Sequence, residues 1–439
     1  MNALTDQQVS RRTALKGAAL LLAPAALAAC GSSGGGSASS GPVSLNFWTH
    51  TDPPLVTVTK AAIASFRKTN PSISVSYTTI PNTEFFTKML TSMTTGTGPD
   101  VFDMNDDYVR GDYIPRNLLD PVDPKALGYG SLSQLTAAYD PGALGGATGA
   151  GGKVYGVPLE LDSAGFAINT TLFAKAGLDP ADYPKTWDEV GTMGAKIVKA
   201  TGAQGFNFVY LTGWALLQLE ILLLQTGGLV VDSSGKRAVI NQAGGVQALQ
   251  IWSDLVNKYH AGNPHTATLN SAVPYYDFSV GKQGMTIMFP WAMAQIQQQY
   301  PDIVKHMQLV PLPQVNPGNA HRFDYGYSWV VSAHSSLAKQ QAAWKFVGHL
   351  AKAHSQYLSQ AGLVQPVTNW QNSTAGKQMP FSSQWATSYQ KSEFFPVAAN
   401  WSQITSIMQT AVENVTLNGK NVQSSLNSAA QQINQAVQQ

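Results

Sequence analysis

Charged residues are scarce in this sequence. Lysine, arginine, aspartate and glutamate make up 12% of the 439 residues, about half their share in an average soluble protein. The 27 basic and 25 acidic residues nearly cancel, and the formal net charge is +2 at pH 7. A chain without a strong positive balance lacks the electrostatic footprint of a nucleic-acid-binding protein. We therefore expect no nucleic-acid partner, and a neutral polar ligand suits the chain better than a polyanion.

Cysteine is nearly absent, because Cys30 is the single cysteine in the chain. One cysteine can form neither an internal disulfide nor a structural zinc site. The eight histidines show no H-E-x-x-H motif and no compact pairing with carboxylates. We therefore expect no bound metal and no cofactor.

Sequence signatures of ATP hydrolysis and of serine hydrolases are also missing. The chain has no G-x-x-x-x-G-K-[ST] phosphate loop, which excludes the ATPase subunit of a transporter. Residues 31–35 match G-x-S-x-G, but they lie in a Ser/Gly tract and not between a strand and a helix. These observations favour a protein that is not an enzyme.

The first forty residues have the order of an export signal. Two adjacent arginines, Arg11 and Arg12, precede a short apolar run at residues 18–29. This run is shorter than the roughly 20 residues that cross a bilayer, and small residues end it, as in a secretory signal peptide. The arginine pair resembles a twin-arginine export signal, although Ala14 stands where such signals usually have Phe. That resemblance implies export of an already folded protein.

The sequence LAAC at residues 27–30 resembles the lipoprotein box of bacteria. In that family the cysteine sulfur receives a lipid and the chain is then cleaved before the cysteine. Residues 31–41 are almost entirely Ser and Gly, as in a flexible tether. We expect residues 1–29 to be a signal peptide and residues 30–42 to be the lipidated cysteine and its tether. Acyl chains on Cys30 would then hold the protein on the outer face of the cytoplasmic membrane.

The chain after the tether alternates between strand and helix patterns. Residues 43–48 alternate apolar and polar side chains, residues 54–68 follow with helical spacing, and residues 73–77 alternate again. A second helical pattern at residues 84–94 leads to a short apolar run at residues 101–104. Strand–helix–strand alternation predicts an α/β fold with a largely parallel sheet.

Helical patterns dominate the later part of the chain, between a few extended runs. The extended runs are residues 154–158, 165–168, 285–289 and 327–332. The helical patterns are residues 173–176, 187–199, 216–225, 245–259, 337–350 and most of 402–439. The stretch at residues 216–224 is mostly apolar, but nine residues cannot span a membrane, so we expect a buried core helix.

Five segments carry a resemblance to a known family. They are GKVYGVP at residues 152–158, FAINTTLFAKAGL at 166–178, PKTWDE at 184–189, GKQGMTIM through PW at 281–291, and YSWVVS with AAWKFV at 327–332 and 342–347. In this order they resemble the extracellular solute-binding proteins of bacterial ABC importers, in the carbohydrate-binding group that includes maltose-binding protein. The resemblance covers most of residues 43–350, and the last ninety residues match loosely.

The resemblance implies a two-lobed periplasmic-binding-protein-like fold of type II. Strands cross between the lobes, a ligand lies in the cleft, and the lobes close by hinge bending. We expect residues 43–158 and 290–327 to form the N-terminal lobe, and residues 159–289 and 328–439 the C-terminal lobe. The implied function is that of a monomeric substrate-binding lipoprotein. It would capture a sugar or oligosaccharide and deliver it to the importer's permease subunits, touching the membrane through its lipid anchor alone.

Candidate ligand contacts follow from the chemistry of sugars, whose apolar faces pack on aromatic rings and whose hydroxyls bind carboxylates. Trp291 follows a buried strand where the family places a stacking aromatic, and Glu160 stands where maltose-binding relatives have a cleft carboxylate. Asp106 and Asp107 end the strand at residues 101–104, and the carboxyl ends of parallel strands line such clefts. We expect one of the two to contact the ligand and the other to cap a helix. The further candidates, for which ordinary packing or capping is the alternative, are Trp48, His50, Trp214, Tyr325, Tyr327, Trp370 and Glu84.

Three alternatives remain open from the sequence. The same receptor could bind a polyamine, a phosphodiester or a metal chelate, and a cluster of carboxylates without stacking aromatics would favour a polyamine. A secreted glycoside hydrolase would use two carboxylates such as Asp162 and Asp106 as acid and base. A purely structural surface lipoprotein would have no accessible cleft.

Overall fold

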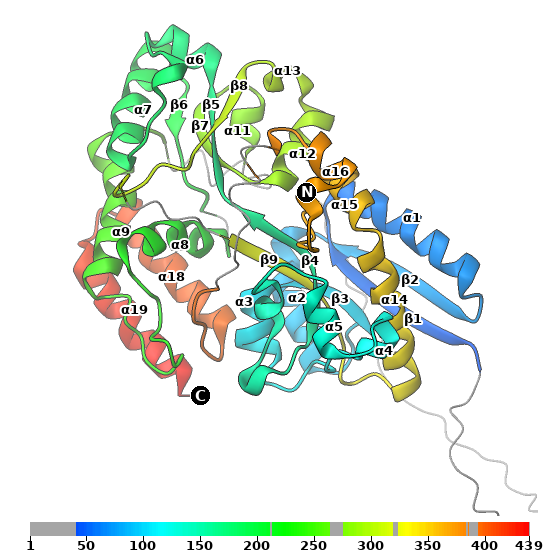
Figure 1. Ribbon diagram of the computed structural model, residues 1–439. Coiled ribbons are helices and arrows are strands. Elements are labelled where there is room, and N and C mark those ends of the chain that lie inside the picture. Colours follow the sequence, from blue (N-terminus) through cyan, green and yellow to red (C-terminus); the bar gives the residue numbers. More distant parts are fainter. Residues whose placement is uncertain are drawn as a thin grey trace, which may run out of the picture. The chain divides into compact units, whose positions relative to one another are not determined.

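We describe the fold from a computed structural model. It describes residues 41–210, 213–263, 275–318, 324–382, 385 and 394–438. The expected export signal with Arg11 and Arg12, and the expected lipidation site Cys30, lie outside the described residues. Residues from Gly41 onward form one compact unit, in which helices cover two β-sheets (Figure 1).

The first sheet has five strands in the order β2-β1-β3-β9-β4. Their bounds are β1 Val43–His50, β2 Ile73–Ile80, β3 Val101–Asn105, β4 Gly156–Ser163 and β9 Asp324–Val331. Strand β1 runs parallel to β2 and β3, as the strand–helix alternation predicts, and β9 runs antiparallel to β3 and β4. The parallel part brings the carboxyl ends of β1 and β3 to one edge, where Thr51, Asp52 and Asp106 begin the following loops and helices.

Helices pack around the first sheet, and the start of α1 has a clear local cause. The longer ones are α1 Pro53–Thr69, α2 Asn82–Thr94, α14 Leu337–Lys352 and α15 His354–Ala361. The shorter ones are α3 Asp106–Tyr108, η1 Val109–Tyr113, α4 Pro124–Leu127, α5 Leu132–Ala137, η2 Ala143–Ala147 and η3 Ala150–Gly152. Asp52 caps α1, since its carboxylate accepts a hydrogen bond from the Leu55 amide at 2.9 Å. This cap holds the Asp52 side chain at the start of α1, beside the carboxyl end of β1.

The second sheet has four strands in the order β6-β7-β5-β8. Their bounds are β5 Gly165–Asn169, β6 Gln204–Phe206, β7 Gln283–Met288 and β8 Met307–Val310. The helices nearby are α6 Thr170–Lys175, η4 Pro180–Asp182, α7 Trp187–Thr201, α8 Trp214–Thr226, α9 Ala243–Ser253, η5 Asp254–Lys258, α11 Tyr276–Ser279, α12 Pro290–Gln299, α13 Pro301–Val304, η6 Trp370–Asn372 and α16 Thr374–Gln378. Thr186 and Glu189 form a complete capping box at the start of α7.

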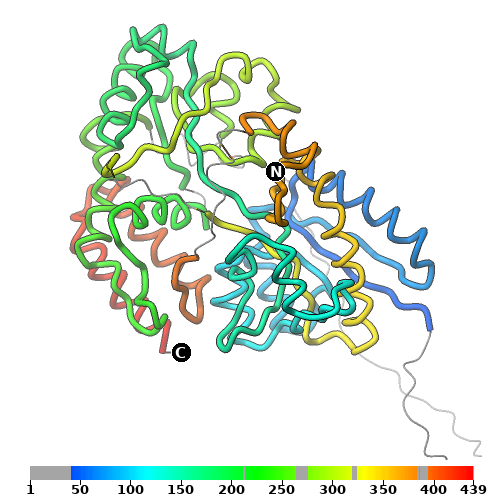
Figure 2. Tube along the Cα trace, in the orientation of Figure 1, coloured from blue at the N-terminus to red at the C-terminus, as the bar shows by residue number. Residues whose placement is uncertain are grey.

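The last two helices complete the core next to α8 and α9. They are α18 Trp401–Thr416 and α19 Val422–Val437, which pack on each other and on α8 and α9 (Figure 2). Their apolar side chains belong to the same buried cluster as those of α8. Within the part of the chain that the structure describes, no helix is both long and apolar enough to cross a bilayer.

The chain crosses between the two sheets at points that differ from the lobe boundaries we expected. Strand β4 stays in the first sheet to Ser163, and β5 of the second sheet begins two residues later. Strand β8 pairs with β5 in the second sheet, although we placed residues 290–327 in the N-terminal lobe. Strand β9 pairs within the first sheet through Val331, and α14 packs on this sheet, although we placed residues 328–439 in the C-terminal lobe. These memberships depend on pairing between residues far apart in sequence, which local patterns do not reveal.

Candidate functional site

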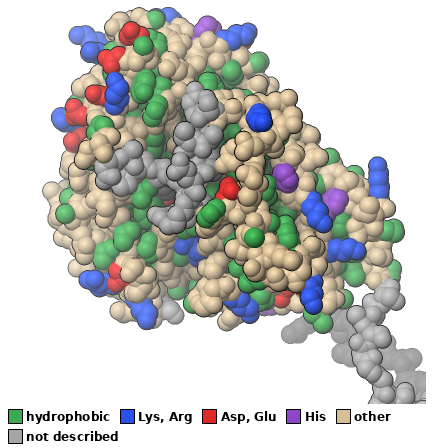
Figure 3. Space-filling view, viewed as in Figure 1, with side chains coloured by type: hydrophobic (Ala, Val, Ile, Leu, Met, Phe, Trp, Pro, Cys, Tyr) green, Lys and Arg blue, Asp and Glu red, His purple; other side chains and the backbone are tan. Residues whose placement is uncertain are grey.

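A cavity of ≈ 190 Å³ lies between the two sheets. One side is formed by the end of β1, the start of α1, α2, β4 and β9, and the other by α8 and α12. The lining residues are His50, Thr51, Asp52, Pro53, Asn82, Phe85, Phe86, Glu160, Trp214, Tyr275, Trp291, Gln295, Gln299, Tyr325, Tyr327 and Leu363. We call this cavity the main cleft. Few of the lining residues are charged, in keeping with the mostly neutral face of the molecule in Figure 3.

Four aromatic side chains form a wall along the main cleft. Pro290 starts α12 and places Trp291 in its first turn. Gly213 precedes Trp214 at the start of α8, and its backbone φ of +88° is a conformation that favours glycine. The ring centroids of Trp214 and Trp291 lie 5.8 Å apart at an angle of 56°, and those of Trp214 and Tyr325 lie 6.2 Å apart. The Trp291 indole N–H donates to the Tyr325 hydroxyl. Both tryptophans remain half-buried, so their faces can still receive a ligand.

The fourth member of this wall, Tyr327, lies beside a buried ion pair. The ring centroids of Tyr327 and His50 lie 5.0 Å apart. His50 Nδ1 lies 2.6 Å from Asp103 Oδ2, and the His50 backbone N–H donates to Asp103 Oδ1 at 3.1 Å. Burial alone would lower the pKa of His50, but the charge of Asp103, with smaller contributions from Glu160 and Asp52, raises it from 6.5 to about 9. The cleft therefore holds a histidinium whose charge is already paired.

Two carboxyl groups of β4 lie near the aromatic wall, and one of them lines the cleft. Glu160 and Asp162 lie two residues apart on the strand and therefore share a face. Glu160 is 4% exposed and lines the cleft, while Asp162 is fully buried. Burial raises the pKa of Glu160 well above its usual range, and the charge of Asp162 raises it further. Glu160 Oε2 has no hydrogen-bond partner among the described residues, so a ligand hydroxyl could bind there.

A hydrogen bond across the cleft joins the two sides. Gln295 on α12 donates through Nε2 to the carboxylate of Asp52, and accepts a hydrogen bond from the Tyr275 hydroxyl. Burial raises the pKa of Asp52 above its usual value. This contact and the Trp291–Tyr325 hydrogen bond both connect α12 with elements of the first sheet.

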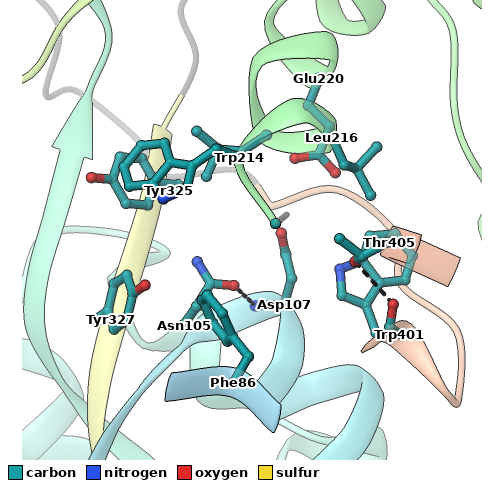
Figure 4. Close-up of a pocket in the computed structure, with 12 residues that line it drawn as sticks. Phe86, Asn105, Asp107, Trp214, Leu216, Glu220, Tyr325, Tyr327, Trp401 and Thr405 are labelled. Carbon is teal, nitrogen blue, oxygen red and sulfur yellow. Dashed lines mark hydrogen bonds between the residues drawn. The ribbon is translucent and has the colours of Figure 1, made fainter. Parts of the chain in front are cut away.

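A smaller pocket of ≈ 20 Å³ opens beside the main cleft, and we call it the inner pocket (Figure 4). It shares Phe86, Trp214, Tyr325 and Tyr327 with the main cleft. Its other lining residues are Asn105, Asp107, Gly213, Leu216, Leu217, Glu220, Trp401 and Thr405. Asn105 accepts a hydrogen bond from the Asp107 amide at 3.1 Å, so Asn105 caps α3 and neither aspartate does. Asp107 is paired with Arg110, which also donates to the Phe395 carbonyl at 2.8 Å.

The two pockets bring together seven of the eleven candidate contacts. His50, Glu160 and Trp291 line the main cleft, Asp107 lines the inner pocket, and three aromatic residues line both. Those three are Trp214, Tyr325 and Tyr327.

The other four candidates lie away from both pockets. Asp106 is 4% exposed and accepts a hydrogen bond from Ser328 at 2.7 Å. Its carboxylate lies so close to Gly146 and Gly326 that a Cβ atom at either glycine would collide with it. Burial raises its pKa to about 7. The three remaining ones are Trp48, which packs on the core, Trp370, which is buried in a separate apolar cluster, and Glu84, which is exposed in the first turn of α2. These positions indicate packing for the two tryptophans and a solvent contact for Glu84.

Several lining residues were not among the candidates. Asp52 carried a local signal, because an Asp followed by two prolines is typical of a helix start. Glu220 is an acidic residue inside an apolar run, and this contrast was the one local sign that it could line a pocket. Gln295 and Tyr275 carried none, because their place in the cleft depends on how α12 meets the first sheet.

Known proteins resemble this chain in sequence and in fold. The family model described as bacterial extracellular solute-binding protein matches residues 52–357. An arabinooligosaccharide-binding protein of Bacillus subtilis is 25% identical over 340 residues, which cover 74% of each chain. A Brucella abortus relative, named only as a binding protein, is 23% identical over 292 residues, and the match spans 66% of its length, slightly under two thirds.

Solved structures share the fold over nearly the whole chain. The GacH receptor of Streptomyces glaucescens, solved unliganded and with acarbose, has a TM-score of 0.77 at 20% identity, covering 90% of this chain and 99% of that one. Maltose-bound MalE3 of T. maritima has a TM-score of 0.77 at 22% identity, covering 89% and 99%. The fold is therefore the two-lobed α/β periplasmic-binding-protein fold of type II. Since the family model covers well over half of the sequence, this chain belongs to the family of bacterial extracellular solute-binding proteins.

Proposed function

We propose that this protein captures a sugar or oligosaccharide in the main cleft and delivers it to the permease of an ABC-type importer. The observation that carries the proposal is the pairing of half-buried indole faces with a carboxyl group that has one oxygen without a hydrogen-bond partner among the described residues. Trp291 and Trp214 offer flat apolar surfaces, and Glu160 offers a buried oxygen that needs a hydrogen-bond partner. The relative named for arabino-oligosaccharides and the neighbours that hold maltose and acarbose support the same class of ligand.

The arrangement supports a receptor better than a glycoside hydrolase. A hydrolase needs two carboxyl groups on either side of the bond that is cleaved. Asp162 is fully buried behind the cleft surface, and the Asp106 carboxylate is enclosed by Gly146, Gly326 and Ser328. A sugar in the main cleft would therefore meet neither of the proposed catalytic pair.

A thermal-shift screen of neutral and aminated mono- and oligosaccharides tests the proposal. A ligand that binds only the folded state, at about 100 times its Kd, stabilises that state by about 2.7 kcal/mol. We expect at least one sugar to raise the melting temperature reproducibly and to remain unchanged after incubation with the protein. A screen in which no sugar raises the melting temperature, or in which the sugar is cleaved, would count against the proposal.

Lipid anchoring through Cys30 is the second part of the proposed function. Replacing Cys30 with serine removes the sulfur that would carry the lipid, and a signal without acyl chains gives no stable membrane attachment. We expect Cys30→Ser to move the protein from the membrane fraction to the soluble fraction of cells. Its sugar affinity should stay the same, because Cys30 lies outside the folded unit that begins at Gly41. Retention of the variant in the membrane fraction would contradict the anchor.

A further inference from the structure

The inner pocket contains an acidic residue that the proposed sugar contacts do not use. Glu220 lies on α8, which carries mostly apolar side chains into the core. The residue is 2% exposed, and its Oε1 has no hydrogen-bond partner among the described residues. A buried carboxyl oxygen without a hydrogen-bond partner costs free energy, so its presence in an apolar helix points to a partner that comes from outside the chain.

The geometry of the inner pocket limits what that partner can be. In Figure 4 the carboxyl groups of Glu220 and Asp107 turn toward the same space, with Leu216 and Trp401 beside it. The volume of ≈ 20 Å³ holds about one group of the size of a water molecule. Because the inner pocket and the main cleft share Trp214 and three other aromatic residues, a small group attached to a ligand in the cleft can reach Glu220.

Acidic groups outnumber basic groups around the two pockets. The acidic lining residues are Asp52, Glu160, Asp107 and Glu220. The nearby basic groups already form ion pairs, since His50 pairs with Asp103 and Arg110 pairs with Asp107. Aromatic ring faces also attract cations. Among the described residues no group of three or more His, Cys, Asp or Glu could hold a metal ion, so a molecular cation fits better than a metal.

We propose that the ligand is a sugar that carries a protonated amine, and that Glu220 binds this amine in the inner pocket. The inference rests on the proposed sugar-binding function and names the ligand class of the same cleft. A linear polyamine would match the carboxyl groups but would leave the faces of Trp214 and Trp291 without a ring to cover them. An acidic sugar or a phosphodiester would bring a negative charge beside the carboxyl groups of Glu160 and Glu220, while the nearby His50 and Arg110 are already paired with Asp103 and Asp107.

Binding of the amine has a consequence for protons. Burial raises the pKa of Glu220 well above its usual range, and the charge of Asp107 raises it further, while Arg110 opposes the shift. In the absence of ligand, this raised pKa shifts Glu220 toward the neutral acid. An ammonium group beside it favours the carboxylate, so Glu220 loses its proton to the solvent and the ammonium keeps its own. Formation of the complex should therefore be accompanied by net release of protons.

The first test compares amino sugars with their neutral parents by calorimetry at pH 7. Suitable pairs are glucosamine with glucose, galactosamine with galactose, mannosamine with mannose, and the β-1,4-linked glucosamine dimer with cellobiose. We expect at least one amino sugar to bind at least about tenfold more tightly than its parent, with net release of protons. Neutral sugars that bind equally or better in every pair would overturn the amine inference and leave the sugar-binding function standing. Binding by neither class would overturn both.

The second test uses Glu220→Gln, which keeps the size of the side chain and removes its charge. The affinity for the amino sugar should fall at least about tenfold, the affinity for the neutral parent should change little, and the net proton release should disappear. Glu413→Gln is the matched control, because Glu413 is half-buried on α18 outside both pockets, and it should leave all three values unchanged. Should Glu220→Gln fail to fold, the wild type still decides, since amino-sugar binding without proton release overturns the role of Glu220. An equal loss for amino sugar and parent would also overturn it.

Discussion

Replacing Trp291 with alanine is expected to weaken sugar binding by about thirtyfold or more while the protein stays folded. A tryptophan face that is about half covered by a sugar removes roughly 75–125 Å² of apolar surface from water, which stabilises a complex by about 2–3 kcal/mol. Each 1.4 kcal/mol corresponds to about a tenfold change in Kd. Isothermal titration with the sugar that gives the largest thermal shift measures the effect.

Trp291→Phe is the control for the shape of the aromatic face. Phenylalanine keeps a flat ring at the start of α12 but loses the indole N–H that donates to Tyr325. We expect its affinity to lie between those of the wild type and the alanine variant. If Trp291→Ala bound the sugar as tightly as the wild type, Trp291 would not belong to the site.

Replacing Asp103 with asparagine is expected to lower the free energy of unfolding by about 3 kcal/mol at pH 6. Asp103 is fully buried, and the His50 side chain that it pairs with is 13% exposed. The rise of the His50 pKa from 6.5 to about 9 corresponds to about 3 kcal/mol of interaction with the charged form. Removing one partner of a buried ion pair costs about 3–5 kcal/mol in measured cases. Urea unfolding followed by circular dichroism measures the difference.

The pH dependence of this difference follows from the direction of the pKa change. Below about pH 6.5 the histidine is protonated in the folded and the unfolded chain, so the contribution of the pair is fully present. The contribution is lost as the pH rises through about 9, where folded His50 releases its proton. The stability difference between wild type and Asp103→Asn should therefore shrink from pH 6 toward the alkaline side of 9. A difference that stays constant over this range would contradict the ion pair.

A matched control for Asp103→Asn exists on the surface. Asp302 lies 3.1 Å from Lys305, and its side chain is 93% exposed. Exposed ion pairs contribute about 0–1 kcal/mol, so Asp302→Asn should change stability little at any pH. A loss comparable to that of Asp103→Asn would mean that the assay reports net charge and not the buried pair.

Local sequence patterns predicted the elements at residues 43–105 well. The strands β1, β2 and β3 and the helices α1 and α2 lie where alternating and helical spacing placed them. Strands β6 and β8 were not predicted, because three or four residues are too few to show a period of two. The pairing of β9 within the first sheet and the packing of α14 on that sheet were not predicted either, because both depend on strands far apart in sequence.

Family resemblance and strand-end reasoning each predicted part of the candidate site. His50 ends β1, Glu160 lies on β4, and Trp291 begins α12 just after β7, and all three line the main cleft. Trp291 and Glu160 were expected from the family resemblance, and His50 from its place at a strand end. Strand-end reasoning also pointed to Asp106, whose carboxylate binds Ser328 because Gly146 and Gly326 leave room for it. Glu220 was treated as part of a core helix, since no local pattern tells whether one acidic residue in an apolar run faces a pocket.

A crystal structure of the protein with the sugar that raises the melting temperature most tests the central claim directly. We expect one sugar ring packed on the face of Trp291 in the main cleft, with a ligand hydroxyl within hydrogen-bond distance of Glu160. A sugar bound elsewhere on the protein, with the main cleft free of it, would contradict the claim that this cleft is the solute-binding site.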